Sequence, residues 1–267
     1  PEYYPTRTER RILTDNAAAI SAHCGRDCVL IEPGAGSCEK ARLLLEHLRP
    51  AAYVPLDISA DYLQASAMAL GREYPWLNVQ AICADFNDQW TFLDALPAGK
   101  RVVFYPGSTI GNLEPAQARA FLARSRELVG PGGGMVVGVD LHKSSERLNA
   151  AYNDADGVTA RFNLNILSRL NEELGAGFDP GRFSHHAFYD ADKQRIEMHL
   201  VSDRAQSVRV EGRDIPFDAG ESIHTENSYK YTVEQFAQLA DSAGLALQES
   251  WLDAERLFSV HYLAVSN

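Results

Sequence analysis

Apolar positions in the first 141 residues come in short runs, separated by longer stretches in which they recur every three or four residues. Each short run is typical of a buried strand, and each longer stretch is typical of an amphipathic helix. A repeated strand-then-helix order predicts parallel strands joined by right-handed crossovers. The predicted strands cover residues 28–33, 53–57, 79–83, 101–105 and 135–141, and predicted helices follow at 37–48, 62–68 and 121–128.

This order changes after residue 141. A helical pattern over residues 162–174 stops at Gly175, and short alternating segments follow, as in a small antiparallel sheet. Residues 190–194 are typical of a hairpin turn. The alternating segments cover residues 186–189, 195–201, 207–210 and 223–225.

The last part of the chain returns to the first pattern. It predicts a helix over residues 232–243 and then an antiparallel pair of strands over 245–251 and 258–265. We therefore expect two lobes. One is made of residues 8–141 and 230–267, and the inserted lobe is made of residues 1–7 and 142–229.

Composition narrows the class of ligand. With 267 residues, of which 45% are hydrophobic and 23% charged, the chain can bury a core as one large domain or two modest ones. It has neither an apolar run of about 18 residues nor the pattern of a signal peptide, so we expect a cytoplasmic protein without a membrane span. A net charge of −11 disfavours a nucleic-acid partner, because such binding depends on clustered Lys and Arg. Small molecules are the favoured ligands.

Neither the cysteines nor the histidines predict a metal site. Cys24 and Cys28 have no second pair at ligand spacing, and Cys28 and Cys83 fall in apolar runs, so we expect reduced core thiols. The pair His185-His186 has no acid or cysteine partner at ligand spacing and is interpreted as histidines of a surface strand.

A glycine turn, Gly34-Ala35-Gly36, follows the first predicted strand and opens a helix. Such a turn brings bare backbone and helix N–H groups against a ligand, and nicotinamide, flavin and S-adenosylmethionine sites all use it. A dinucleotide site needs a third glycine for its pyrophosphate, but position 39 is Glu. Glu32 and Glu39 are compatible with the positive sulfonium of S-adenosylmethionine. The turn therefore favours a methyltransferase.

Acids at the ends of the next two strands extend this interpretation. Asp57 lies about 20 residues after the glycines, the spacing at which an acid binds ribose hydroxyls. The alternative role for Asp57 is an N-cap of the following helix. Asp85 and Phe86 are suited to hold an adenine by its amino group and ring face. After the fourth strand, residues 106–113 form a second glycine-punctuated loop, where a parallel sheet places reacting groups.

Several motifs together resemble the histidine-specific N-alpha-methyltransferases of ergothioneine biosynthesis, which make trimethylhistidine (hercynine). They are PEYYPTRTE, IEPGAGSCEKARLLL, YPGSTIGNL, AYNDADGVTARFNLNIL followed by NEELG, and HTENSYKY, and they span nearly the whole chain in order. The resemblance implies a Rossmann-like class I S-adenosylmethionine-dependent methyltransferase domain of α/β class, with an inserted α+β substrate-binding lobe. It also implies L-histidine as the substrate.

The resemblance also implies roles for single residues. The cofactor residues are Gly34, Lys40, Asp57, Asp85 and Phe86. The substrate's amino group would meet Asn112, with Tyr4 nearby to relay a proton. From the pattern alone, the favoured role of the two tyrosines of PEYYP is a hydrophobic staple at the entrance of a helix. That helix is predicted to start near Glu9, and its apolar face consists of Ile12, Leu13, Ala17 and Ile20. The other expected substrate-binding residues are Tyr152 for the carboxylate, Glu226 and Ser228 for the imidazole, and Met198 beside it.

Three alternatives stay open at this point. The nearest is a related enzyme that acts on another aromatic amino acid, such as tryptophan, or on a histidine derivative. Glu226 separates the two, because an indole offers only a donor. The others are a nicotinamide-binding oxidoreductase, which Glu39 disfavours, and a non-catalytic ligand-binding module.

Overall fold

The computed structural model describes residues 2–85 and 96–266, and the chain divides into two compact units. The smaller unit consists of Pro1–Tyr4 and His142–Lys230, and the larger consists of Pro5–Leu141 and Tyr231–Asn267. Relative to the boundaries expected from the sequence, residues 5–7 fall in the larger unit and residue 230 falls in the smaller one.

The larger unit is built on a seven-stranded sheet with the strand order β11-β12-β5-β4-β1-β2-β3. Strands β1 to β5 pair in parallel with one another, whereas β12 is antiparallel to both β5 and β11. This confirms the expected parallel sheet with an antiparallel pair of strands. The strands are β1 Val29–Pro33, β2 Ala52–Asp57, β3 Ile82–Cys83, β4 Arg101–Tyr105, β5 Gly134–Asp140, β11 Leu245–Leu252 and β12 Phe258–Val265.

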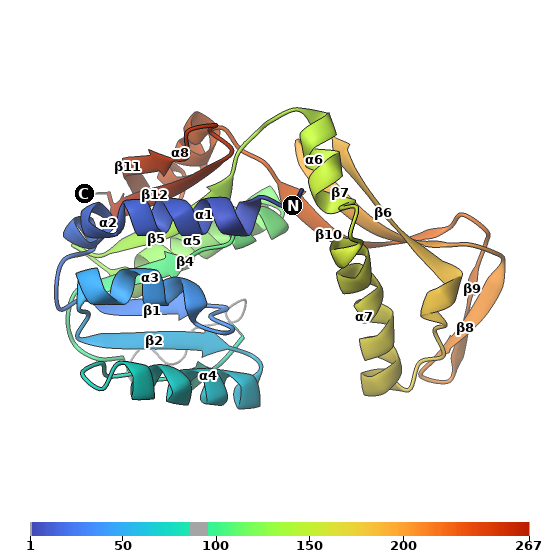
Figure 1. Cartoon of the computed structure of the whole chain (residues 1–267), viewed down its shortest axis with the longest axis horizontal. Helices are drawn as coiled ribbons and strands as arrows, with labels where there is room; N and C mark the ends of the chain where they lie inside the picture. The colour runs from blue at the N-terminus through green and yellow to red at the C-terminus, as the bar shows by residue number, and fades with distance from the viewer. Residues whose placement is uncertain (1, 86–95, 267) are drawn as a thin grey trace. The chain divides into compact units, whose positions relative to one another are not determined.

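Helices cover both faces of this sheet (Figure 1). Leu30 packs in a core with α1, α2 and α3 on one face, whereas its neighbours Val29 and Ile31 pack with α5 and α8 on the other. This alternation is the reason that β1 reads as a continuous apolar run, since both of its faces are buried. The helices are α1 Pro5–Asp15, α2 Ala17–Cys24, α3 Glu39–Leu48, α4 Ala60–Glu73, the 3-10 turn η2 Thr109–Asn112, α5 Pro115–Val129 and α8 Val233–Asp241.

The third expected strand is shorter than predicted. Only β3 is regular, and residue Val79 makes a single bridge to Tyr53. The segment is at the edge of the sheet and has β2 as its only strand neighbour among the described residues. This edge position also leaves Cys83 exposed, contrary to the expected core thiol, whereas Cys24, Cys28 and Cys38 are buried free thiols.

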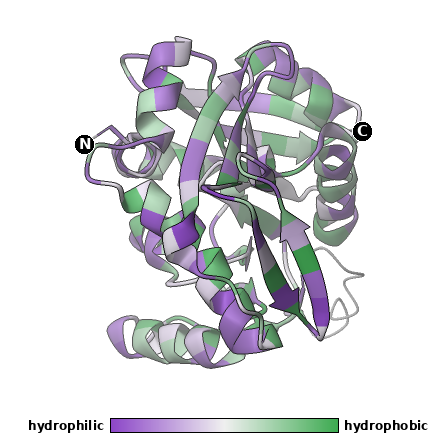
Figure 2. Cartoon of the chain, turned by 90° about the vertical axis from the view of Figure 1, so that its right-hand side faces the viewer, coloured by the Kyte–Doolittle hydropathy of each residue, from purple (hydrophilic) through white to green (hydrophobic). Residues whose placement is uncertain are grey.

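The smaller unit packs two helices against antiparallel strands. Its three-stranded sheet has the order β10-β7-β6, and β8 and β9 form a separate hairpin. Polar and apolar segments alternate along strand ribbons in Figure 2, as expected for sheets with one packed and one polar face. The elements are α6 Ser145–Tyr152, α7 Val158–Leu174, the 3-10 turn η3 Pro180–Arg182, β6 Phe183–Asp190, β7 Arg195–Ser202, β8 Gln206–Val210, β9 Arg213–Phe217 and β10 Ser222–Tyr229.

One helix and one strand of the smaller unit were not predicted from the sequence, and neither was the short turn η3. The α6 helix begins after Ser144, whose Oγ accepts a hydrogen bond from Arg147 N (3.3 Å) as an N-cap, and it ends in the AYND motif. The β9 strand is mostly exposed and contains Pro216, so its alternation is weak. Within the described parts of both units, no helix is long and apolar enough to cross a membrane.

Candidate active site

The glycine turn between β1 and α3 is held by Asp57, the last residue of β2. Gly34 and Gly36 have φ values of 69° and 51°, in the left-handed region that favours glycine. Gly36 N donates to Asp57 Oδ2 (3.1 Å), and Ser59 N donates to Asp57 Oδ1 (2.9 Å). The N-cap of α4 is Ser59, so Asp57 ties the turn to the end of β2 instead of capping that helix.

Lys40, on the first turn of α3, is paired with a buried acid of α1. Its Nζ lies 2.6 Å from Glu9 Oε2, and the other oxygen, Oε1, accepts a hydrogen bond from Gly107 N (2.7 Å). Glu9 is fully buried, and a buried charge is stable only when paired and hydrogen-bonded. Glu9 therefore joins α1, α3 and the loop after β4. Sequence reasoning missed Glu9, and its only signal was its place in the PEYYPTRTE motif.

A second buried acid lies in β1 just before the glycine turn. Glu32 Oε2 accepts a hydrogen bond from Tyr53 Oη at 2.5 Å, and burial raises the pKa of the Glu32 carboxyl to about 8. The nearby Lys40 opposes that rise but does not reverse it. Below that pKa this carboxyl is mainly neutral, so it is a hydrogen-bonding group unless a cation approaches it.

The glycine turn, Glu32 and Lys40 line one cavity of about 250 Å³ in the larger unit, and Glu9 and Asp57 are outside its lining. Its two basic side chains are already compensated, Lys40 by Glu9 and Arg10 by Glu39 at 3.4 Å. A diphosphate would lack a surplus of positive charge here, whereas a sulfonium and an α-amino group suit the acids. The lining residues are Thr6, Arg10, Glu32, Gly34, Ala35, Gly36, Ser37, Glu39, Lys40, Pro106, Gly107 and Thr109.

The remaining residues predicted for the larger unit lie at the ends of strands of the same sheet. Asp85 follows β3 and is exposed, and Asn112 is the exposed last residue of η2, after β4. Phe86 lies outside the described residues. Because parallel strands end at one edge, Asp85 and Asn112 follow the same edge as the glycine turn.

The smaller unit contains a separate cavity of about 350 Å³. Three of the predicted substrate-binding residues line it, namely Tyr152, Met198 and Glu226. Tyr3 also lines it and packs edge-on against the Tyr152 ring, with 5.7 Å between the ring centres. The other lining residues are Asp154, Asp156, Val158, Thr159 and Phe162.

Ser228, predicted to bind the imidazole, is outside the lining of this cavity and is buried in a small polar cluster with Tyr152, which does line it. Tyr152 Oη donates to Ser228 Oγ at 2.9 Å, and Lys230 Nζ donates to the same Oγ at 2.6 Å and to Tyr152 Oη at 3.0 Å. Lys230 is 1% exposed and was not predicted as a site residue. The signal available was the alternation of β10, because Glu226, Ser228 and Lys230 are spaced by two in HTENSYKY.

Tyr4 has a different environment from Tyr3. It is 1% exposed, and the cations of Lys143 and Arg147 lie 4.5 and 5.7 Å from its ring centre. It is outside the set of residues that line the 350 Å³ cavity. Its packing among cations suits both predicted roles, the proton relay and the staple.

Asp154 was also missed, and its role is local. Its two oxygens accept hydrogen bonds from Val158 N and Thr159 N, each at 2.8 Å, at the start of α7. Hydrogen bonds, chiefly from Thr159, lower the pKa of the Asp154 carboxyl to about 2. Asp154 therefore holds the α7 wall of the cavity.

One histidine-containing group in the smaller unit has ligand-like spacing. Glu197, His199 and His224 offer atoms within 4.8 Å of one another. Glu197 Oε1 already accepts hydrogen bonds from Arg195 and Lys193, and His199 bonds to Glu197 Oε2 at 3.1 Å. With its carboxylate compensated by two cations, the group is interpreted as a polar network, and we assign no metal.

The pair His185-His186 divides into two roles. His185 is half-buried and bonds through its ring nitrogens to Asn163 Nδ2 (2.9 Å) and to Tyr152 O (2.8 Å), whereas His186 is exposed. The expectation of surface-strand histidines therefore describes His186 but not His185, which braces the last residue of α6.

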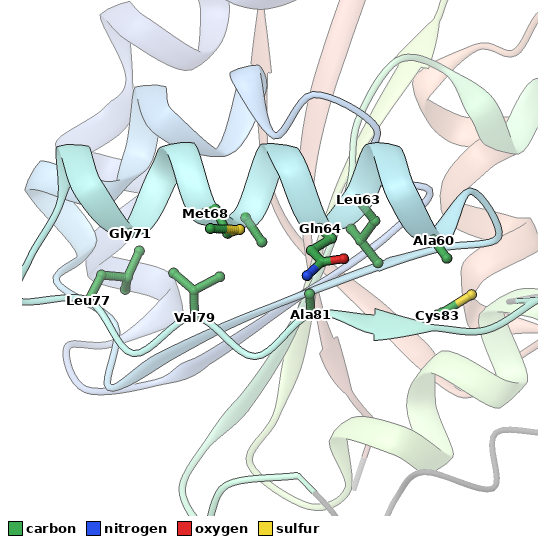
Figure 3. Close-up of a pocket in the computed structure, with 10 residues that line it drawn as sticks. Ala60, Leu63, Gln64, Met68, Gly71, Leu77, Val79, Ala81 and Cys83 are labelled. Atoms are coloured by element: carbon green, nitrogen blue, oxygen red, sulfur yellow. The ribbon is translucent and has the colours of Figure 1, made fainter.

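Another hollow of the larger unit carries none of the predicted residues. It has a volume of about 590 Å³ and lies between α4 and the segment that ends in β3 (Figure 3). Its lining is mainly apolar, and Gln64 and Cys83 supply its polar side-chain atoms. None of the described residues that line it is charged, and we assign it no role.

The fold first defines the class of protein. A methyltransferase of Streptomyces caelestis, CcbJ, has a similar solved structure, with a TM-score of 0.55 at 18% sequence identity and 96% of each chain covered. The topology is that of a class I S-adenosylmethionine-dependent methyltransferase, and the compensated charges around the glycine turn agree with that cofactor.

The family is more specific than the class. Residues 1–265 match the family described as histidine-specific, SAM-dependent methyltransferase, and the chain belongs to this family. It is 43% identical to a histidine N-alpha-methyltransferase of Mycolicibacterium smegmatis over 95% of this chain and 80% of the relative. It is 30% identical to ergothioneine biosynthesis protein 1 of Neurospora crassa over 99% of this chain and 31% of that protein. Family membership excludes the oxidoreductase alternative.

Proposed function

We propose that this protein transfers methyl groups from S-adenosylmethionine to the α-amino group of L-histidine, giving trimethylhistidine as the first step of ergothioneine biosynthesis. The single observation that supports it most is the match to the histidine-specific family over residues 1–265. The cavity lined by Tyr152, Met198 and Glu226 supports it independently of that match.

The cofactor would be held in the larger unit by Gly34, Lys40, Asp57, Asp85 and Phe86. When bound, it supplies an electrophilic methyl group on a positive sulfur, so in-line alignment of the acceptor can supply much of the rate acceleration. Asp57 fixes the turn through Gly36 N and presents its carboxylate to ribose hydroxyls. Lys40, neutralised by Glu9, fixes the start of α3.

The substrate would be held by residues of the smaller unit together with Asn112. Glu226 accepts the imidazole N–H, Ser228 meets the other ring nitrogen, Met198 packs beside the ring and Tyr152 is directed to the carboxylate. The amine must be neutral to react, so Asn112 would orient its lone pair through a carbonyl acceptor, with Tyr4 or water relaying the proton. We also propose a cytoplasmic location, for which four free thiols are typical.

The function is tested by incubating the protein with labelled S-adenosylmethionine and a panel of free amino acids. We expect label in histidine, and mass spectrometry to show up to three added methyl groups. Preferred labelling of tryptophan or of a histidine derivative would contradict the proposed acceptor. Calorimetric titration with S-adenosylhomocysteine, with NADH as the control ligand, tests the cofactor separately.

A further inference from the structure

Glu9 is an acid on the buried face of α1, where an amphipathic helix normally has apolar side chains. It shares this face with Ile12 and Leu13 and is fully buried. A buried ion pair is weak evidence for stability, because replacing it with packed apolar residues is often neutral or stabilising. The position therefore points to a role for Glu9 other than stability.

The two oxygens of Glu9 bond to two donors that both line the cavity around the glycine turn. Oε2 lies 2.6 Å from Lys40 Nζ, and Oε1 accepts a hydrogen bond from Gly107 N (2.7 Å). A carboxylate has two acceptor oxygens and no donor, so it satisfies both groups at once. A glutamine has one oxygen, and its NH2 group would meet whichever donor the oxygen leaves. The arrangement therefore requires a carboxylate.

Gly107 lets Lys40 lie directly against the loop that follows β4. Its φ of 87° is in the left-handed region that favours glycine, and a Cβ at this position would lie 3.0 Å from Lys40 Nζ. The ammonium of Lys40, the carboxylate of Glu9 and the amide of Gly107 thus form one compact group. This group joins the start of α3 to the loop after β4.

The same loop leads directly to Asn112, which we propose orients the substrate's amine. Ser108 follows Gly107 and has a φ of 55°, which is strained for a residue other than glycine. Its Oγ accepts a hydrogen bond from Asp140 N (2.9 Å), and its carbonyl oxygen accepts one from Gly111 N (2.8 Å) within η2. Asn112 is the last residue of η2. The loop is therefore fixed to α1 on one side and to β5 on the other, and these bonds set where Asn112 lies.

We infer that Glu9 is a positioning residue for methyl transfer, which holds the loop carrying Asn112 in register with the Lys40 side of the cavity. This inference rests on the proposed function. Glu9 is outside the lining of the cavity, so it acts through Gly107 and Lys40. An in-line transfer needs its donor and acceptor aligned, and a displacement of about 1 Å can lower the rate about 100-fold. Loss of the Glu9 contacts should therefore lower kcat.

The first test measures histidine methylation, with both substrates saturating, in Glu9→Gln and in the double variant Glu9→Gln/Lys40→Met. In Glu9→Gln, the amide oxygen should turn to Lys40, because bonds to an ammonium are stronger, and the NH2 group then faces the Gly107 N–H. We expect kcat to fall about tenfold or more. In the double variant the oxygen is free to accept from Gly107. We expect kcat to rise about threefold or more above that of Glu9→Gln, while KM for the cofactor increases.

This recovery separates positioning from a general loss of structure, because a second substitution in a merely destabilised protein would not restore kcat. The matched control is Glu46→Gln on α3, which removes the partner of Arg49 at a side chain that is 55% exposed and should keep the wild-type kcat. A wild-type kcat in Glu9→Gln, or no recovery in the double variant, would overturn the inference and leave the proposed function intact. Failure of the wild type to methylate histidine would instead overturn the proposed function.

A second test does not depend on turnover. Hydrogen exchange followed by mass spectrometry compares peptides that contain residues 106–112 in wild type, Glu9→Gln and the double variant. Exchange in this loop should be about tenfold faster in Glu9→Gln, because the Gly107 amide loses its bond to a charged group, and slower again in the double variant. Peptides of the β8–β9 hairpin should exchange equally in all three proteins. Unchanged exchange in the loop, or equal acceleration in the hairpin, would overturn the inference.

Discussion

At the scale of single residues, two buried acids near the glycine turn differ in how their burial is compensated. Glu9 stays charged because Lys40 and the amide of Gly107 compensate it. Glu32 has Tyr53 as its hydrogen-bond partner, and burial raises the pKa of its carboxyl to about 8. Glu9 neutralises Lys40, and Glu32 is mainly protonated below its pKa, so the wall of the cavity around the glycine turn has little surplus charge and suits a cationic sulfur better than a phosphate.

The first prediction concerns Glu32→Gln in cofactor-free protein. An unfolded Glu has a pKa of about 4.3, whereas the pKa of folded Glu32 is about 8. Between these values the folded state holds a proton that the unfolded state releases, so rising pH costs wild type stability. The variant lacks this cost, and its Tm advantage should grow from pH 5 to pH 8 and then level off.

Differential scanning calorimetry at several pH values measures this Tm difference. Glu39→Gln is the control, because that side chain is 63% exposed and should give a small difference at every pH. A Tm difference for Glu32→Gln that stays constant, or that shrinks as the pH rises, would show that Glu32 is ionised in the folded protein.

At the scale of elements, β5 has a glycine that makes room for an acid of α1. A Cβ added at Gly138 would lie only 1.9 Å from Glu9 Oε1. The position therefore needs glycine because of a neighbouring side chain rather than because of its own backbone angles. Gly138 leaves room for Glu9 to reach both Lys40 and Gly107, which line the cavity around the glycine turn.

The second prediction is that Gly138→Ala destabilises the protein by about 1–3 kcal/mol, the usual cost of overpacking a core. Binding of S-adenosylhomocysteine should weaken as well, because Glu9 and Lys40 must move. Urea unfolding and calorimetric titration measure the two effects. Gly71→Ala, in α4 with no atom within 4 Å of the added Cβ, is the matched control and should stabilise by about 0.5–1 kcal/mol. Equal effects of the two substitutions would contradict the proposed role of Gly138.

At the scale of the whole molecule, the candidate residues divide between two units. The cavity around the glycine turn belongs to Pro5–Leu141 and Tyr231–Asn267, and the cavity with Glu226 belongs to Pro1–Tyr4 and His142–Lys230. Each cavity is lined by residues of its own unit. Cofactor binding and substrate recognition should therefore respond to different substitutions.

The third prediction compares Asp57→Asn with Glu226→Ala. Asp57→Asn should weaken S-adenosylhomocysteine about tenfold or more, because hydrogen bonds to a charged group contribute about 1.5–3 kcal/mol. Glu226→Ala should leave that affinity nearly unchanged and abolish most histidine turnover. Calorimetric titration and a methylation assay measure the two properties. Histidine turnover that survives Glu226→Ala would remove Glu226 from its role.

Several parts of the fold were predictable because they depend on local pattern. The runs of β1, β4 and β5 are apolar on both faces, and Gly130 at the end of α5 marks a helix terminus. The short β3 was overpredicted, because its pairing depends on its place at the sheet edge. The α6 helix was missed, because it has eight residues of which three are buried, and so short an element gives a weak helical pattern.

The sequence by itself determined the open parallel sheet, the interruption after residue 141, the family and the order of the motifs, since each is written in the spacing or identity of neighbouring residues. Only the tertiary structure decided that Glu9 reaches Lys40 and Gly107, and that Lys230 and Tyr152 donate hydrogen bonds to Ser228 Oγ. These contacts join residues 31 to 98 positions apart, or depend on burial that pattern does not reveal. Their charge and hydrogen-bond states follow from which groups share a water-free space, and that is a property of the folded chain.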